Sequence, residues 1–265
     1  MYWVLQENLF QEAHWDALIK TLGRLELPYS VHKIIPFSNH LEPEISPEGP
    51  VIVMGAIRLA TIAKQRGWKP GSFENGNFDF EKQRKHWGEL MLNADAVVCK
   101  FEEVPNYCGV IQTEDDHFFM RPVHDTKSFT GMVTNWTEFR DWHRRLVIAF
   151  EEDSRCTVKP KTPVVISKPK VITWEYRLWI VDGKVVTSSA YKAGGRLMVN
   201  PYVNPAAIEF AEKAAKSWAP ARAFVMDIAE TPDGLKIIEV NNINSAGFYS
   251  CNIGKMIEAL EDMTW

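Results

Sequence analysis

Two acidic residues near the end of the chain have the types and spacing to bind a metal ion. Residues 224–242 read FVMDIAETPDGLKIIEVNN, in which two alternating β-branched runs flank Pro232-Asp233-Gly234, a strong turn signal. A hairpin centred on this turn places Asp227 opposite Glu239, with Asn241 on the same face. Opposed carboxylates repel each other unless a positive charge lies between them. Two acidic oxygens and an amide oxygen therefore predict a site for a hard cation such as Mg²⁺.

The rest of this hairpin is apolar. The face turned away from the acidic pair is predicted to be core and carries Phe224, Met226, Ile228, Ile238 and Val240. The alternative for Asp227 and Glu239 is two separate ion pairs with basic residues on a solvated face. The Glu-x-Asn sequence on an otherwise apolar strand, with a third ligand in register, favours the metal site.

A second hairpin, residues 173–192, turns on Asp182-Gly183, the preferred two-residue signal. Symmetric pairing about this turn places Glu175 opposite Ala190 and Arg177 opposite Ser188. One face is then mixed in charge, and it carries Glu175, Arg177, Ser188 and Lys192. The other is the expected core face, with Trp174, Tyr176, Leu178, Ile180, Val185, Thr187, Ser189 and Tyr191. The mixed face is either a solvated surface or a wall for a phosphorylated ligand.

Composition limits the class of protein. The 265 residues are 46% hydrophobic and 24% charged, which is typical of a soluble globular protein of one large or two to three small domains. A net charge of −4 gives no indication of a nucleic-acid or membrane surface. We see no apolar run near the roughly 20 residues that span a bilayer, and no signal peptide, so we expect a cytoplasmic protein. The four scattered cysteines predict reduced thiols rather than a disulfide or zinc framework.

The elements that position these residues follow from hydrophobic periodicity. The first hundred residues predict a small α/β unit with a parallel sheet, with strands at 2–7, 31–36, 50–54 and 96–100 and helices at 10–23, 57–66 and 81–92. Beyond them we expect a strand at 117–121, a helix capped by Asn135, and helices at 204–218 and up to about residue 260. The Pro- and Lys-rich segment 159–170 holds one short strand, 164–167, and is the expected hinge.

Four segments together resemble the ATP-grasp superfamily. They are FFMRPVHDTKSFTG, PVVISKPK, EYRLWIVDGKVV with the return strand SSAYK, and FVMDIAETPDGLKIIEVNN, and they cover about residues 115–245. The chain looks most similar to a divergent clade, common in bacteria and phages, that is marked by one arginine and two lysines around the phosphates. The P-loop sequence and the protein-kinase motifs are absent.

The resemblance implies an α/β (α+β) fold of ATP-grasp type. Its parts would be an N-terminal α/β domain at 1–100, a lid subdomain at 101–168, and a C-terminal antiparallel-sheet subdomain at 169–265 that carries the metal hairpin. It also implies that Asp227, Glu239 and Asn241 are Mg²⁺ ligands that bridge the phosphates of ATP.

The remaining site residues follow from the same resemblance. The ATP-binding positions are matched by Arg121, Lys127, Val165, Ile166, Ser167, Lys168, Glu175, Arg177 and Lys192. Among them, residues 165–168 match the hinge whose backbone contacts adenine, and Arg121, Arg177 and Lys192 match the catalytic cations. Most members carry lysine at the position of Arg121, although arginine can hold phosphate in a bidentate fork. Alternatively, Lys127 and Lys168 are solvent-exposed, and Arg177 and Lys192 only neutralise Glu175.

The activity that the resemblance implies is an ATP- and Mg²⁺-dependent ligase. It would join a small-molecule or peptide carboxylate to an amine or thiol through an acyl phosphate, with release of ADP and phosphate. Two alternatives stay open: a non-hydrolysing ATP-binding assembly factor for a protein partner, and a kinase-like phosphoryl transferase. No residue of the first hundred indicates which carboxylate or amine is used.

Overall fold

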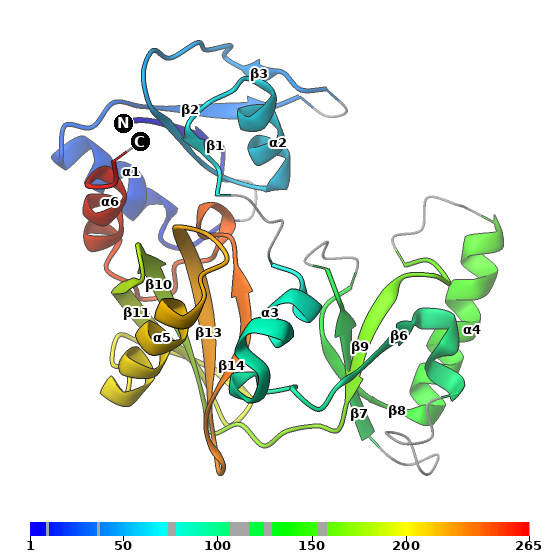
Figure 1. Ribbon diagram of the computed structural model, residues 1–265. Helices are drawn as coiled ribbons and strands as arrows, with labels where there is room; N and C mark the ends of the chain where they lie inside the picture. Colours follow the sequence, from blue (N-terminus) through cyan, green and yellow to red (C-terminus); the bar gives the residue numbers. More distant parts are fainter. Residues whose placement is uncertain are drawn as a thin grey trace. The chain divides into compact units, whose positions relative to one another are not determined.

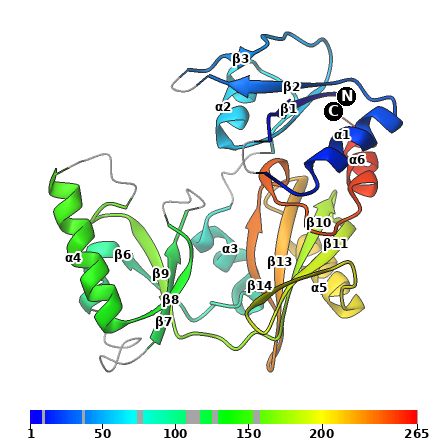
Figure 2. The same cartoon turned by 180° about the vertical axis from the view of Figure 1, so that it is seen from behind.

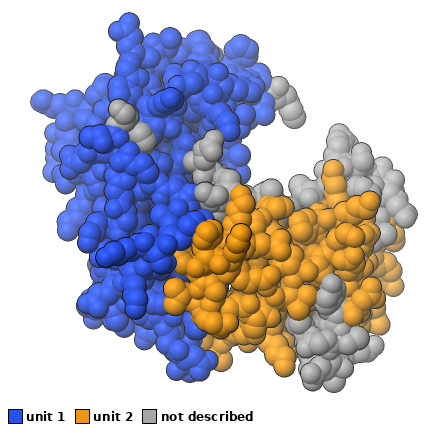
Figure 3. Space-filling view, in the orientation of Figure 1, with its two compact units in different colours: residues 1–77, 172–265 blue, residues 78–171 orange. Residues whose placement is uncertain are grey.

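The computed structural model describes residues 1–8, 11–35, 38–73, 78–106, 117–124, 129–152 and 158–264. The chain divides into two compact units, residues 1–77 with 172–265 and residues 78–171, which Figure 3 colours separately. The three domains expected from the sequence group the chain differently, because they place α3 (Phe80–Trp87) and β6 (Val97–Lys100) in the first domain, whereas both belong to the second unit. The three-part division stays a prediction.

The first unit begins with a mostly parallel sheet (Figure 1). Its strand order is β3-β2-β1-β4-β5, with β1 (Tyr2–Gln6), β2 (Tyr29–Ile34), β3 (Leu41–Glu42), β4 (Val51–Met54) and β5 (Pro70–Gly71). The pairs β1–β2, β1–β4 and β4–β5 are parallel, as predicted, and α1 (Trp15–Arg24) and α2 (Ile57–Gln65) connect them. All four residues of β4 are buried, which is typical of a parallel strand covered on both faces.

A second, antiparallel sheet follows in the same unit. Its order is β12-β11-β10-β13-β14, with β10 (Trp174–Val181), β11 (Lys184–Ala193), β12 (Arg196–Asn200), β13 (Ala223–Thr231) and β14 (Gly234–Asn241). α5 (Pro205–Ser217) starts at the capping side chain of Asn204 and packs over β10, β11 and β13, which Figure 2 shows from behind. β12 was not predicted, because all five of its residues are exposed and carry no alternating pattern.

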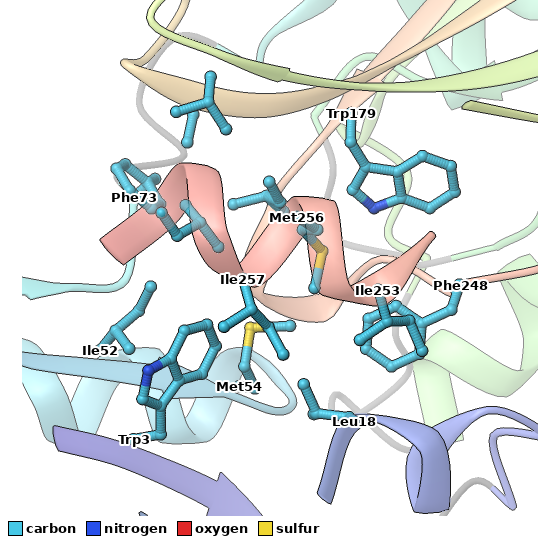
Figure 4. Close-up of a cluster of buried hydrophobic side chains, with 14 of the residues drawn as sticks. Trp3, Leu18, Ile52, Met54, Phe73, Trp179, Phe248, Ile253, Met256 and Ile257 are labelled. Carbon is cyan, nitrogen blue, oxygen red and sulfur yellow. The ribbon is translucent and has the colours of Figure 1, made fainter. Parts of the chain in front are cut away.

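One hydrophobic cluster joins the two sheets of the first unit. Its centre is α6 (Ile253–Glu261), which buries Ile253, Met256, Ile257 and Leu260. Around this helix lie Trp3, Ile52 and Met54 from the first sheet, Leu18 from α1, and Trp179 from the second sheet (Figure 4). The helix that ends the chain therefore fixes the two sheets against each other.

Two buried asparagines add a polar link between the same sheets. Asn244 donates its amide N–H to the carbonyl of Val53 at 2.7 Å and accepts the backbone N–H of Phe73 at 3.0 Å. Asn242 donates to the carbonyl of Phe73 and to the hydroxyl of Ser72. Both follow the last residue of β14 closely, so the end of that strand is anchored to β4 and to the segment after β5.

The second unit is built on a four-stranded antiparallel sheet. Its order is β6-β9-β7-β8, with β7 (His117–Pro122), β8 (Met132–Asn135) and β9 (Pro163–Ser167). α4 (Trp136–Glu152) begins where the side chain of Asn135 accepts the backbone N–H of Glu138 at 2.9 Å, which confirms the predicted cap. Phe101, Phe118, Phe139 and Trp142 form an aromatic core beneath it. Among the helices that the structure describes, none has the length and apolar character to cross a membrane.

We expect Asn244→Ala to lower the free energy of unfolding by about 2–4 kcal/mol, because it leaves the Val53 carbonyl and the Phe73 N–H buried without this partner. Urea unfolding monitored by circular dichroism measures the loss. Ser245→Ala is the matched control, since Ser245 is the exposed next residue. Equal stability of the two variants would show that the asparagine link is not important for the fold.

Candidate metal and phosphate site

The metal hairpin forms with the predicted pairing at its acidic residues. Asp227 lies opposite Glu239, and Asn241 lies opposite Val225. The turn itself is one residue tighter than expected, since Thr231 pairs with Gly234, and a bulge before the Asp227 pair restores the register. That bulge corrects the predicted core face: Ile237 is fully buried and pairs with Ile228, whereas Ile238 is only partly buried.

The register of the second hairpin was predicted wrongly. Two bulges shift β11 along β10, so that Arg177 lies opposite Ser189 rather than Ser188, and Glu175 lies opposite Lys192 rather than Ala190. A shift of one residue turns side chains to the other face. Thr187 and Ser189 therefore lie on the face of Arg177 and not on the expected core face. Glu175, Arg177 and Lys192 still share one face, because the second bulge restores it for Lys192.

Arg177 and Asp227 form a buried bidentate ion pair at the centre of this sheet. They are opposed residues of β10 and β13, and the Arg177 Nε and Nη2 atoms donate to the two carboxylate oxygens at 2.9 and 2.8 Å. The side chain of Arg177 is 12% exposed and that of Asp227 is 2% exposed. The mixed-charge face is thus a covered wall at this point and not a solvated surface.

Two tyrosines complete the surroundings of the guanidinium. Tyr191 and Tyr249 stack with their ring centroids 4.9 Å apart, and the guanidinium carbon of Arg177 lies 5.6 and 5.0 Å from the two centroids. Tyr249 has a φ of 48°, which a non-glycine residue adopts only under constraint. The remaining terminal nitrogen of Arg177, Nη1, is 3.4 Å from the carbonyl oxygen of Gly247. Together these contacts hold the guanidinium in place.

The loop after β14 is held against this face by polar contacts that the sequence did not indicate. The hydroxyls of Ser189 and Ser250 are 2.8 Å apart, and the Thr187 hydroxyl accepts the N–H of Asn252 at 2.7 Å. Glu12 accepts the N–H of Phe248 at 3.2 Å. A side chain at Gly247 would meet the Glu12 carboxylate at 3.3 Å, so glycine permits this close approach.

Sequence reasoning assigned no site role to Glu12, Gly247 or Tyr249 and placed Tyr191 in the core. Glu12 is more than 200 residues from the loop that it contacts. A local pattern carries no signal for such a pair. The turn signal at Asn244-Ser245-Ala246-Gly247 is the one feature that pointed to this loop.

The charges at the site are not balanced by Arg177 alone. Burial raises the pKa of Asp227 above its ordinary value; Arg177 opposes this, and the charges of Glu239 and Glu175 add to the rise. Burial lowers the pKa of Arg177, but the charge and hydrogen bonds of Asp227 outweigh burial and raise it, so the guanidinium stays charged. Three carboxylates therefore act on one region, and a further cation would be favourable there.

Lys192 is the more accessible cation of this face. Its Nζ lies 3.2 Å from Glu175 Oε1, and its side chain is 41% exposed, against 12% for Glu175. The Tyr191 hydroxyl donates to the other oxygen of Glu175 at 2.8 Å. Burial and the charges of Asp227 and Glu175 raise the pKa of Tyr191, so it remains a neutral donor. Lys192 is thus oriented by Glu175 while part of its surface faces solvent.

The donor set suits Mg²⁺ that is also bound by phosphate. Asn241 donates its amide N–H to Glu239 at 3.1 Å, which orients both side chains of β14. Within the described residues no three His, Cys, Asp or Glu side chains form a ready-made metal cluster. Mg²⁺ commonly takes one or two carboxylates and completes its shell with water and substrate phosphate. Asp227 uses both oxygens for Arg177, and each oxygen has a second lone pair for a metal.

The predicted residues of the second unit lie on one sheet. Arg121 of β7 pairs with Val165 of β9, and its guanidinium carbon lies 5.3 Å from the ring centre of Phe80. Val165 and Ile166 pair with β6 on one side and β7 on the other, so the sheet already uses their backbone groups. The Ser167 hydroxyl donates to Asn93, and Lys168, which follows the strand, is exposed.

A hinge contact to adenine is therefore most accessible at the end of β9, near Ser167 and Lys168. Lys127 lies outside the described residues. The two described cysteines, Cys99 and Cys251, are free, and burial raises the pKa of each thiol to about 12, so neither is an activated nucleophile.

A family model of an ATP-grasp domain, family 3 of a clade named for one arginine and two lysines, matches residues 64–260, well over half of the chain. The protein belongs to this ATP-grasp family. The match covers β13, β14 and the whole second unit, and so includes the Asp227–Glu239 pair, Arg177, Lys192 and the hinge strand. A search of curated proteins gave no match.

Solved structures of ATP-grasp proteins share the fold over nearly the whole chain. An ATP-grasp RimK domain protein from Sphaerobacter thermophilus aligns with a TM-score of 0.65 at 11% identity, covering 98% of this chain and 100% of the other. The ATP-grasp ligase PsnB, complexed with a minimal precursor, aligns with a TM-score of 0.56 at 14% identity, covering 98% and 97%. D-alanine–D-alanine ligase from Bacillus anthracis gives 0.58 at 14% identity, covering 98% and 92%. At these identities the similarity establishes the fold of the ATP-grasp protein.

We expect Arg177→Met to lower the free energy of unfolding by about 3–5 kcal/mol, because it leaves the Asp227 carboxylate buried without its cation. Arg222→Met is the matched control: Arg222 holds Asp182 in the same bidentate geometry, but both side chains are exposed, and the cost should stay below about 1 kcal/mol. Denaturant unfolding compares the two. Similar losses would contradict a central role for the buried pair.

The Arg177→Met loss should shrink as the pH falls. A carboxyl group whose folded-state pKa is raised binds more protons when folded than when unfolded, so stability decreases as pH rises through that range. The pKa of Asp227 is already raised by burial with Arg177 present, and removal of the arginine raises it further. Unfolding measured at about pH 5 and about pH 8 should show the larger deficit at the higher pH.

Proposed function

We propose that this ATP-grasp protein is an ATP- and Mg²⁺-dependent ligase that joins a carboxylate to an amine or thiol. The observation that carries the proposal is the Asp227–Glu239 pair, opposed on rigid strands beside two cations. The substrate carboxylate attacks the terminal phosphorus of ATP, the bond to the ADP oxygen breaks, and an acyl phosphate forms. The nucleophile then attacks the carbonyl carbon, phosphate leaves, and the nucleophile loses its proton.

Mg²⁺ would be held by Asp227, Glu239 and Asn241 together with phosphate oxygens, and when bound it supplies charge neutralisation on the phosphates. The raised pKa of Asp227 supports this assignment, because excess negative charge at the site favours a divalent cation. Arg177 keeps the Asp227 carboxylate in one orientation. We assign Arg177 a positioning role on this account, since its donors already contact Asp227 and the Gly247 carbonyl.

Lys192 is the cation that we assign to the phosphates and the acyl phosphate. It is held by Glu175 and partly exposed, so it can reach a ligand without leaving a buried partner unpaired. Arg121 and Lys127 would act as further cations from the second unit. The backbone at residues 165–168, chiefly Ser167 and Lys168, would bind adenine.

We infer a small-molecule or peptide carboxylate as substrate. The similar solved structures include D-alanine–D-alanine ligase, D-cycloserine synthetase DcsG, and PsnB in complex with its precursor peptide. Their shared fold supports this class of substrate for the present chain without selecting one.

The test is ADP release by the purified protein with ATP, Mg²⁺, and pools of amino acids or peptides. Release that requires both a carboxylate and an amine supports the ligase. Tight nucleotide binding without turnover would overturn it in favour of an assembly factor, and a stable phosphorylated product without a joined amine would favour a kinase-like transferase.

Glu239→Gln should weaken Mg²⁺-dependent ATP binding by roughly tenfold or more, because one of two carboxylates facing the metal loses its charge. Titration calorimetry with and without Mg²⁺ measures the change. Asp233→Asn, at the exposed tip of the same hairpin, is the control and should bind like the parent. Unchanged Mg²⁺ dependence in Glu239→Gln would remove Glu239 from the metal site.

Lys192→Gln should lower turnover by roughly 100-fold while leaving the melting temperature nearly unchanged, because the side chain is partly exposed and stabilises transferred phosphate rather than the fold. Lys184→Gln, on the same strand, is the control: Lys184 is 77% exposed and 3.7 Å from Glu212. If both variants turn over at the parent rate, Lys192 has no catalytic role.

A further inference from the structure

A groove in the first unit lies apart from the metal and phosphate site. It has a volume of about 500 Å³ and runs between α2 and the segment 67–73, which contains β5. Small-molecule sites typically measure about 300–1,000 Å³. We call this feature the α2 groove. None of the residues assigned to ATP or Mg²⁺ lines it.

The lining of the α2 groove is positive and largely apolar. Its ten lining residues include two lysines, Lys64 and Lys69, and no carboxylate, although the chain as a whole carries a net charge of −4. Half of the ten are apolar, among them Ile57, which is 46% exposed, and Phe73. Positive charge beside an exposed apolar surface is complementary to an organic anion with an apolar body.

The neighbouring arginine does not disturb this charge pattern. Arg66 forms an ion pair with Glu44 and donates to the carbonyl of Ile45 at 2.8 Å. Its guanidinium also lies over the ring of Trp68, 5.2 Å from the centroid. Arg66 is thereby neutralised and fixed, and it holds Trp68 as one side of the groove.

Both walls of the groove are held before any ligand arrives. The carbonyl of Lys69 accepts the N–H of Val51 at 2.7 Å, and the N–H of Trp68 donates to the carbonyl of Ala63 at 3.0 Å. Ser72 and Phe73 are bonded to Asn244, which is 2% exposed. A preformed groove binds with little cost in ordering its own residues.

We propose that the α2 groove is a second ligand site, which binds a small organic anion with its carboxylate or phosphate at Lys64 and Lys69 and its apolar body against Ile57 and Phe73. The site neither requires ATP nor depends on the proposed ligase activity, so each can fail without the other.

The test is a nuclear magnetic resonance titration of the full chain with three probes that share a phenyl body. The probes are 3-phenylpropionate, phenyl phosphate and the uncharged 3-phenylpropionamide. The signals followed are the indole N–H of Trp68 and the methyl groups of Ile57, assigned with Trp68→Phe and Ile57→Val. We expect saturable shifts with at least one anion and binding of the amide at least about fivefold weaker. The tighter of the two anions identifies the preferred headgroup.

The double variant Lys64→Gln/Lys69→Gln should weaken binding of the preferred anion by at least about fivefold. Lys216→Gln, which removes an exposed lysine of α5, should leave it unchanged. Amide binding as tight as that of the anions, equal binding by the double variant, or the absence of any saturable shift would each overturn the site.

Discussion

The buried ion pair between Arg177 and Asp227 is the interaction on which the site depends. It joins the two central strands, β10 and β13, at the point where the acidic hairpin begins. A buried charge is costly unless it is paired and hydrogen-bonded, and here the fork of the guanidinium satisfies both carboxylate oxygens. The same arginine contacts the Gly247 carbonyl and the two stacked tyrosines, so one side chain orders a strand and a loop together.

The hydrophobic core explains why this pair is buried. Trp179 and Val225 are opposed two residues further along the same strands, on the same face as Arg177 and Asp227, and both belong to the cluster around α6. The loop that leads from β14 into α6 therefore passes over the ion pair. Its polar contacts to Thr187 and Ser189 fix that path. Packing of the last helix and exclusion of water from the site are consequences of one chain path.

The local sequence predicted the elements well and their long-range contacts poorly. The parallel sheet, both hairpins and the Asn135 cap follow from periodicity and turn residues, which are local signals. The pairing of Asp227 with Glu239 was right because a tighter turn and a bulge cancel. In β10–β11 two bulges separate the turn from the site, and the residue opposite Arg177 was missed. Bulges answer to packing on both faces of a sheet, and Glu12 meets the loop only in the folded chain.

The two cations of the site differ in what surrounds them, and this separates what each can do. Arg177 is covered, and its nitrogens contact Asp227 and the Gly247 carbonyl, so a ligand could recruit it only by breaking a buried pair. Lys192 pairs with Glu175, and 41% of its side chain is exposed. Redirecting such a lysine to a phosphate costs far less, because its flexible stem reorients and water screens the carboxylate left behind. A rigid covered arginine and a mobile exposed lysine thus hold the site's shape and its reactivity on separate residues.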